Sequence, residues 1–454
     1  PLFPLLGGKT MENIIKDYIE VKNYSAIKKA LEDMQPADIA ELLEELDTKN
    51  SLLVFRMLHK DVAVEVFAHL SVKQQTSFTL MIKEDELKEI LEELYFDDKI
   101  DYLEEMPSSV VKKILKYSPE TERKLINQFL NYPENSAGSL MTIELVDLKK
   151  ELTIDEALLR IRRTALDKET IYTCYVTDSN RKLEGTVSLK DLVIAPGNKK
   201  VEDIMETDPI FVKTIDDQEE VANLFKKYDL LSVPVVDQEN RLVGIITIDD
   251  IVDVIEEEAS EDIQIMHGLA PSEEEYLKTD IITLAKQRIF WLLFLMLSAT
   301  ITGSIIESFQ GSLEKAVGLA VFIPMLMGTG GNAGTQSSTL VIRGIALGEV
   351  VLSDISKVIW RELRISLMVG VSLAVVNFVR VYYLGRNSFT VSVVVSVTLI
   401  LTIMIAKVIG GVLPLFAKAI NIDPAIMASP LISTIVDALT LLSYFKIAEA
   451  IMHI

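Results

Sequence analysis

Asp437 is the residue whose position points most directly to chemistry, because it lies near the middle of the last apolar segment, residues 430–444. A carboxylate at bilayer depth costs roughly 2.5–3.5 kcal/mol on insertion scales, so such a group normally faces a partner, water or an ion. Asp437 therefore predicts a cation pathway. The alternative is a structural role in which the carboxyl group is protonated, or hydrogen-bonded near Ser433 and Thr440.

A second segment, residues 324–338, places polar and helix-distorting residues inside an apolar stretch. Pro324 frees a backbone carbonyl, and the glycines allow backbones to approach closely. Asn332 and Gln336 add amides, which are tolerated at this depth only if they are buried or line a water-filled path. Tight packing through small residues explains the glycines but not the two amides, so pore lining is favoured.

Two charged residues near these segments allow more than one interpretation. Asp423 precedes Pro424, a pattern typical of a helix N-cap, although the same carboxylate could also collect cations at a pore mouth. Lys407 lies inside the fourth apolar stretch, where it either snorkels to the surface or pairs with an acid. The candidates for lining a pore are Gly328, Asn332, Thr335, Asp423, Ser433 and Asp437.

The charges are segregated along the chain, which has 454 residues and a net charge of −22. Residues 285–454 hold 12 Lys/Arg and 8 Asp/Glu, a net of +4, so the residues before them carry about −26. This division predicts an acidic soluble part followed by an apolar membrane part. The acidic excess attracts cations and repels nucleic acid, so no nucleic-acid partner is expected.

Several enzyme classes are excluded by missing motifs. Cys174 is the single cysteine, which leaves no intrachain disulfide and no cysteine-based zinc cluster. The chain has no HExxH motif and no Walker-A lysine motif, which argues against a metalloprotease and an ATP-driven pump. No enzymatic activity is expected.

Residues 1–10 differ in composition from the acidic sequence that starts at Met11 and are set aside as an appended segment.

Five apolar stretches are long enough to cross a bilayer, at about 288–309, 316–342, 364–385, 389–417 and 425–451. The loop after the second stretch is basic, and basic loops are expected on the cytoplasmic side. The N-terminal part is then inside the cell and the C-terminus outside, in a multi-pass protein of the cell membrane. An odd number of spans disfavours an internal inverted repeat, so the pore is expected between subunits.

The soluble part contains two kinds of pattern. Residues 11–136 have apolar positions at helical spacing among dense acids, which predicts short helices in a small superhelical domain. An internal repeat follows, in which Gly185 and Asp191 match Gly244 and Asp250 at an offset of 59 residues. Each copy reads as helix, strand, turn, strand, helix.

The two copies, residues 137–196 and 197–254, resemble CBS domains. This resemblance implies a paired regulatory module that often binds adenosyl nucleotides, so ATP is a candidate ligand, with Asp191 or Asp250 as its adenosine contact. The acidic run 249–262 has no Gly or Pro and predicts a connecting helix, which is assigned to residues 255–283.

The remaining residues, 284–454, are expected to form the five-helix transmembrane domain. The fold class is therefore a multi-domain membrane protein of α plus α/β type, with an N-terminal α-superhelical domain, a tandem CBS pair and a connecting helix ahead of the membrane. This order of parts, with the segments 324–336 and 423–437, resembles the MgtE family of magnesium channels from Met11 onward.

The resemblance implies a homodimer that passes Mg²⁺ inward through a pore on its two-fold axis. Two copies of Asp437 would face each other, with Asn332 and Thr335 nearby, and a plug helix at about 250–275 would close the cytoplasmic side. It also implies Mg²⁺-sensing acids in three groups: Asp97 and Asp101 beside Asp250; Glu219 and Asp229 beside Asp253; and Glu258, Glu261 and Asp262 across the dimer.

A sensing role for these acids has a simple physical basis. Like charges about 4 Å apart repel by roughly 4 kcal/mol at an effective dielectric near 20, and a bound dication turns that repulsion into attraction. High internal Mg²⁺ is therefore expected to hold the plug shut. Three alternatives stay open: a transporter of another divalent cation, a CBS-regulated exchanger driven by Na⁺ or H⁺ with Asp437 and Lys407 as its coupled pair, and a membrane-anchored sensor without transport.

Overall fold

The computed structural model describes residues 10–272, 276–277, 279–427 and 429–453. The chain divides into two compact units, the first ending at Val254 and the second beginning at Ile255, and each is described by itself. Residues 1–9, which belong to the segment 1–10 that was set aside in the sequence, lie outside the described residues.

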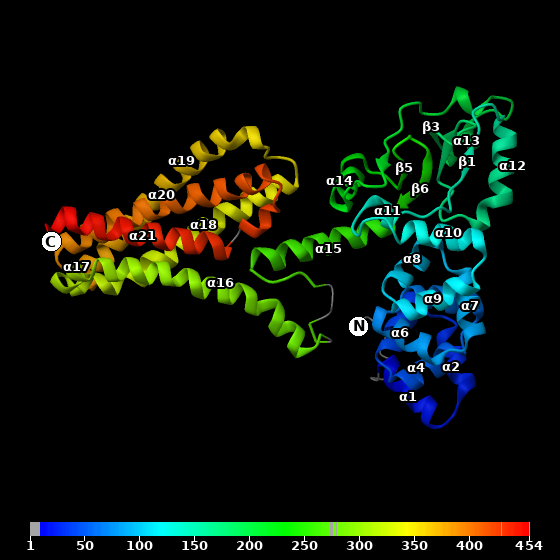
Figure 1. The fold of residues 1–454 in the computed structure, drawn as a ribbon, viewed down its shortest axis with the longest axis horizontal. Helices are drawn as coiled ribbons and strands as arrows, with labels where there is room; N and C mark the ends of the chain where they lie inside the picture. The colour runs from blue at the N-terminus through cyan, green and yellow to red at the C-terminus, as the bar shows by residue number, and fades with distance from the viewer. Residues whose placement is uncertain (1–9, 273–275, 278, 428, 454) are drawn as a thin grey trace. The chain divides into compact units, whose positions relative to one another are not determined.

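Short helices fill the N-terminal part of the first unit, as the apolar spacing predicts (Figure 1). They are α1 (Met11–Glu20), α2 (Tyr24–Leu31), α3 (Pro36–Glu44), α4 (Thr48–Phe55), α5 (Lys60–Ala68), α6 (Val72–Met81), α7 (Glu84–Glu93), α8 (Phe96–Glu104), α9 (Ser108–Tyr117) and α10 (Glu120–Phe129). Aromatic rings form part of their core, where Phe67 packs against Phe55 and edge-on against Tyr102. The Tyr102 hydroxyl shares a 2.7 Å hydrogen bond with Thr79, so its polar end is satisfied.

Two three-stranded sheets of the same topology follow, each with one parallel pair and one hairpin. Val176 lies opposite Gly185 in the first hairpin, and Val235 lies opposite Gly244 in the second, so the predicted repeat is a structural repeat. The elements are α11 (Ala137–Leu140), β1 (Asp147–Leu148), α12 (Ile154–Thr164), η1 (Ala165–Asp167), β2 (Thr173–Thr177), β3 (Leu183–Ser188), α13 (Leu189–Ile194), η2 (Val201–Asp203), β4 (Val212–Lys213), α14 (Gln218–Tyr228), β5 (Ser232–Val236) and β6 (Leu242–Thr247).

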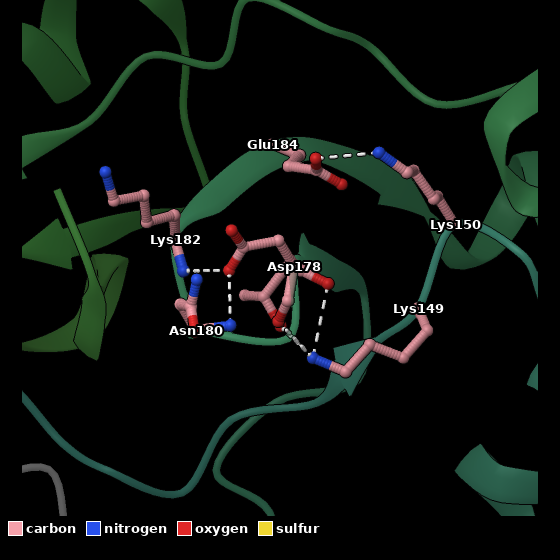
Figure 2. Close-up of polar contacts among 7 residues, drawn as sticks. Lys149, Lys150, Asp178, Asn180, Lys182 and Glu184 are labelled. Atoms are coloured by element: carbon pink, nitrogen blue, oxygen red, sulfur yellow. Dashed lines mark hydrogen bonds and ion pairs between the residues drawn. The ribbon is translucent and has the colours of Figure 1, made fainter.

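The turn between β2 and β3 shows why the repeat carries an acid ahead of a basic residue (Figure 2). Asp178 Oδ1 accepts hydrogen bonds from the backbone N–H groups of Asn180 and Lys182 at 2.7 and 2.8 Å. Lys149 Nζ donates to the Asp178 carbonyl at 2.7 Å and thereby ties the turn to the end of β1. Asp237 makes the equivalent turn bonds in the second copy, so the turn chemistry recurs with the sheet.

The connecting helix is shorter than the predicted plug at 250–275. α15 spans Ile248–Met266. Gly268, two residues beyond its end, adopts a positive φ of 70°, and its N–H donates to the Ile265 carbonyl. This is the usual way in which glycine stops a helix. The first membrane helix then begins at Ile281.

The second unit contains five helices, among its described residues, that are long and apolar enough to cross a membrane, as predicted. Its elements are α16 (Ile281–Ser308), α17 (Gln310–Lys315), η3 (Val317–Phe322), α18 (Ile323–Ala346), η4 (Leu352–Asp354), α19 (Ile355–Val379), η5 (Arg380–Leu384), α20 (Phe389–Ala419), η6 (Pro424–Met427) and α21 (Ser429–Met452). The third span starts earlier than residue 364, because its helix continues through charged residues such as Lys357 and Arg361 before it becomes apolar.

The core of the second unit lies where α18, α20 and α21 pack together (Figure 1). Glycines permit this approach: a Cβ added at Gly410 of α20 would overlap the carbonyl oxygen of Gly334 in α18. A Cβ at Gly334 would lie 2.5 Å from Ile432 Cγ2 of α21. α16, by contrast, buries none of its residues within the chain, so its apolar surface is available to lipid or to another subunit.

Gly410→Ala should destabilise the second unit by about 1–3 kcal/mol, because the overlapping atoms belong to the α18 backbone and the helices must separate. Gly303→Ala is the matched control, because nothing lies within 4 Å of the added Cβ. Both tryptophans, Trp291 and Trp360, lie in this unit, so thermal unfolding in detergent followed by tryptophan fluorescence reports on it. Equal unfolding midpoints for the two variants would contradict the packing described.

Candidate functional site

A polar stripe runs along one side of α18. Gly328, Asn332 and Gln336 follow at intervals of four residues, and all three are exposed in the single chain. Thr335 is partly exposed beside them and donates its hydroxyl hydrogen to the Gly331 carbonyl at 3.0 Å. Such a stripe within a membrane span is incompatible with lipid contact, so it must face water or a second subunit.

α21 presents a second polar row next to this stripe. Ser433 and Asp437 are one turn apart, and both are partly buried. A Cβ added at Gly331 of α18 would lie 3.2 Å from Ser433 Oγ, so the two helices approach closely there. The fold thus brings together two segments that the sequence selected on independent grounds.

The Asp437 carboxylate has no hydrogen bond or ion pair with any residue that the structure describes. Of the two forms of the structural alternative, the hydrogen bonds to Ser433 and Thr440 are not formed among the described residues. Thr440 Oγ1 is itself buried without a hydrogen-bond partner there. An ionised carboxylate in this state within a membrane segment is stabilised by water or by a cation from outside the chain.

Lys407 is not that counter-charge. Its side chain is 5% exposed, and its ammonium group donates to Ser337 Oγ at 3.4 Å. Within the described chain it neither snorkels to the surface nor forms a direct ion pair with an acid. The Asp437–Lys407 pair that a coupled exchanger would use is therefore absent from these residues.

An acidic cluster in the second unit joins α15 to the start of the last span. Burial, followed by the charges of Asp423, Glu258 and Glu261, raises the pKa of Asp262 to about 6. Asp423 Oδ1 also accepts a 2.8 Å hydrogen bond from the backbone N–H of Ala425, so the predicted helix-capping role is confirmed. The same carboxylate caps a helix and repels Asp262, an arrangement that a shared cation would stabilise.

A larger acidic cluster lies in the first unit, where α8 meets the CBS pair. Asp97 at the start of α8 is nearly buried, and burial followed by the charges of Asp250, Asp98 and Glu169 raises its pKa to about 9. The structure thus places Asp97 near Asp250, as the family resemblance implies. A carboxyl with so high a pKa is mostly protonated at neutral pH unless a cation replaces the proton.

Other members of this cluster are perturbed in the same direction. Burial and the charge of Asp249 raise the pKa values of Glu169 and Asp250 to about 7 each. Burial also raises the pKa of Glu144, although two nearby lysines oppose the shift. Glu144 and Glu169 each keep Oε2 buried without a hydrogen-bond partner. Orphaned buried oxygens of this kind are groups that a bound cation would satisfy.

Sequence reasoning missed four members of this cluster: Asp98, Glu144, Glu169 and Asp249. Asp98 and Asp249 are next in sequence to the predicted residues Asp97 and Asp250, and this proximity could have identified them. Glu144 and Glu169 lie in loops ahead of β1 and β2, where no periodicity marks them, and a backbone hydrogen bond of 2.9 Å from Glu169 N–H to the Glu144 carbonyl brings the loops together.

The remaining predicted ligands are surface residues: Asp101, Glu219, Asp229 and Asp253. Glu219 lies in the first turn of α14, whereas Asp229 follows its last turn in a left-handed conformation with φ of 52°. A helix rises 1.5 Å per residue, so these two carboxylates are about 15 Å apart along the axis. Within one chain they cannot hold the same ion.

The described residues contain no group of three His, Cys, Asp or Glu side chains that could hold a metal ion directly. The acids are instead gathered in loose clusters. Such clusters fit Mg²⁺, which prefers oxygen ligands and keeps several of its waters, better than they fit Zn²⁺.

Comparison with known proteins agrees with this distribution of acids. A family model described as divalent cation transporter, MgtE, matches residues 323–447, the MgtE intracellular N domain matches 34–135, and the CBS domain matches 137–197 and 201–257. The chain is similar to the magnesium transporter MgtE of Thermus thermophilus, with 36% identity over 443 residues that cover 97% of this chain and 98% of the relative. The Bacillus subtilis magnesium transporter MgtE is 33% identical, with 94% of each chain covered.

Two solved structures are similar to the first part of the chain. One is the cytosolic domain of the Mg²⁺ channel MgtE in complex with ATP, with 36% identity and a TM-score of 0.52, which covers 54% of this chain and 100% of that one. The other is the soluble part of a magnesium transporter, with 28% identity and a TM-score of 0.51, which covers 55% and 98%.

Proton binding should stabilise the first unit, because its clustered carboxyls have pKa values of about 7 to 9, whereas unfolded carboxyls titrate near 4. This stability is fully present below pH 4 and is lost progressively as pH rises from 4 to the folded-state pKa values of about 7 to 9. The double variant Asp97→Asn with Glu169→Gln should therefore melt several degrees above the wild type at pH 8.5 and close to it at pH 4. Exposure of the buried Cys174 thiol on heating, measured without divalent cations, reports on this unit.

Asp208→Asn is the control, because it removes one exposed carboxylate outside the cluster. Its unfolding midpoint should follow that of the wild type at both pH values. If the double variant has the same midpoint as the wild type at pH 8.5, the cluster is not under electrostatic strain.

Proposed function

Because the chain belongs to the MgtE family of magnesium transporters, we propose that it is a Mg²⁺-selective channel whose pore forms between two copies of the chain. The observation that carries the proposal is the Asp437 carboxylate, which has no partner among the described residues and lies beside an exposed polar stripe at membrane depth. Lipid cannot cover such a surface, whereas a second copy and a hydrated cation can.

Two copies of Asp437 across a two-fold axis supply two negative charges for one dication. Mg²⁺ gives up water reluctantly and requires near-octahedral oxygen geometry. The pore therefore holds a largely hydrated ion, with water contacts from the Asn332 amide and the Thr335 and Ser433 hydroxyls. Gly328 leaves room for the water shell, and Asp423 attracts cations at the inner mouth. Rings of acid are a common device of cation channels.

The basic loop between α18 and α19 supports an orientation in which the first unit lies in the cytoplasm and the C-terminus outside, because basic loops are expected on the cytoplasmic side. In this position the acidic clusters sense internal Mg²⁺. Mg²⁺ at the Asp97–Asp250 cluster holds the N-terminal helices against the CBS pair, and Mg²⁺ between Asp262 and Asp423 holds α15 against the membrane domain. Loss of Mg²⁺ restores the repulsion and opens the pore.

ATP is the proposed nucleotide regulator of the CBS pair, since the solved cytosolic domain of a related channel is a complex with ATP. Asp191 and Asp250 occupy equivalent positions, and each accepts a hydrogen bond from the hydroxyl that precedes its helix, Ser188 at 2.6 Å and Thr247 at 2.9 Å. Asp250 also belongs to the acidic cluster. Asp191 is therefore the better candidate for the adenosine contact.

Asp437→Asn should reduce Mg²⁺ influx into liposomes by about tenfold or more, which corresponds to about 1.4 kcal/mol of lost ion stabilisation. The assay uses purified full-length protein at low internal Mg²⁺, with no Na⁺ or H⁺ gradient. Glu349→Gln, the same chemical change in an exposed loop, should conduct like the wild type. Full influx in Asp437→Asn would place the ion site elsewhere, and no influx in the wild type without a gradient would favour the coupled exchanger.

Asp97→Asn with Asp250→Asn should allow influx to continue at internal Mg²⁺ concentrations that close the wild type. The variant cannot bind the ion that holds the two parts together, although its pore is intact. Mg²⁺ should also protect the first unit of the wild type, but not of this variant, from limited proteolysis. Equal protection of both proteins would remove this cluster from the gating mechanism.

A further inference from the structure

A buried polar junction joins α18, α19 and α20 behind the polar stripe. The Ser337 hydroxyl donates to Glu362 Oε2 at 2.6 Å and accepts a hydrogen bond from the Lys407 ammonium group at 3.4 Å. Ser337, Glu362 and Lys407 are only 1%, 7% and 5% exposed. Among the described residues the two charged side chains have no other polar partner, so one hydroxyl links a carboxylate to an ammonium group across three helices.

The neighbouring glycines make room for this junction. A Cβ added at Gly411 would lie 3.2 Å from Glu362 Cγ, and the backbone of Gly410 packs directly on Gly334. The same added Cβ would also meet the apolar side chains of Val358 and Val341. The Glu362 carboxylate therefore lies in a closely packed region beside apolar side chains.

The junction lies on the opposite side of α18 from the stripe. At 100° per residue, Ser337 is about 140° around the helix from Asn332 and about 160° from Thr335. Ser337 lies about 20° and about 60° around the helix from Gly330 and Gly334, whose contacts hold α18 close to α20 and α21. These contacts, and buried apolar side chains of α18 such as Leu326, have no preferred direction. The hydrogen bonds of Ser337 are directional, so they select one rotation of α18 within this packing.

We propose that Ser337, Glu362 and Lys407 are positioning residues that fix the rotation of α18 and thereby set the preference of the pore for Mg²⁺ over larger cations. The inference rests on the proposed channel function. Stability alone does not account for the junction, because replacing a buried ion pair with apolar residues of similar size is often neutral or stabilising. What apolar residues cannot reproduce is the directional link.

The test compares the wild type with the triple variant Ser337→Ala, Glu362→Met and Lys407→Met. The variant should unfold at the same temperature or higher, whereas its ratio of Mg²⁺ to Ca²⁺ influx should fall about fivefold, which corresponds to about 1 kcal/mol, as for a hydrogen bond between membrane helices. Ser366→Ala is the matched control, because among the described residues this buried serine hydrogen-bonds only to the Leu363 carbonyl of its own helix. Its influx ratio should equal that of the wild type.

A second readout does not depend on transport. In a Cys174→Ser background, Gln336→Cys places a single thiol on the stripe, and its reaction rate with a charged thiol reagent reports the orientation of α18. The triple variant should change this rate at least threefold. If the triple variant changes neither the labelling rate nor the influx ratio, the inference is overturned while the channel function stands. If the wild type shows no Mg²⁺ influx, the channel function is refuted. The labelling rate alone then tests whether the junction sets the rotation of α18.

Two further variants keep the test decisive if the triple variant does not fold. Ser337→Ala alone removes the link but keeps both charges, and it should show the same loss of Mg²⁺ preference. Glu362→Lys and Lys407→Glu should each lose the preference when made singly, whereas the two together exchange the charges around Ser337 and should keep the wild-type ratio. A lower ratio in Ser337→Ala and in both single exchanges, with a wild-type ratio in the double exchange, shows that the link acts. A wild-type ratio in Ser337→Ala shows that it does not.

Discussion

The high cost of a charge in a low-dielectric environment is the constraint on which the rest of this structure depends. Asp437 sits at membrane depth without a partner among the described residues, and Asp97, Asp250 and Glu169 are pressed together where α8 meets the CBS pair. Neither arrangement is stable for ionised carboxylates alone. A dication would stabilise both, so one physical requirement underlies the proposed conducting site and the proposed sensing site.

In the proposed sensor, protons and Mg²⁺ compete for the acids of the first-unit cluster, and this competition would set the range of Mg²⁺ concentrations to which the cluster responds. A carboxyl with a pKa of about 7, such as Glu169 or Asp250, is half-protonated near neutral pH, so the cluster is already partly neutralised before any metal binds. Mg²⁺ must displace those protons, which weakens its apparent affinity. A sensor of an abundant cytosolic ion benefits from weak binding, because a tight site would remain saturated and could not respond.

The sequence was most informative where a single residue violates the rules of its environment. Asp437, Asn332 and Gln336 were recognisable because an apolar segment cannot tolerate them, and the repeat was recognisable because two copies share one turn chemistry. Glu144 and Glu169 could not be found this way. Acids in loops of an acidic chain are unexceptional, and only the tertiary fold, through a backbone bond between two loops, makes them a site. The length of α15 was overestimated because the effect of Gly268 as a helix stop was overlooked.

The position of Lys407 bears on how ions cross the membrane. A carrier that couples two ions commonly uses charged groups that alternate between binding an ion and neutralising each other. Lys407 is instead linked through Ser337 to Glu362, and Asp437 lies on a different helix with no ammonium group among its described partners. The described chain thus offers Asp437 no ammonium partner, and in the proposed channel the passing cation neutralises its carboxylate. A carrier must also return empty, and would then need a group of the chain to neutralise Asp437; the described residues supply none.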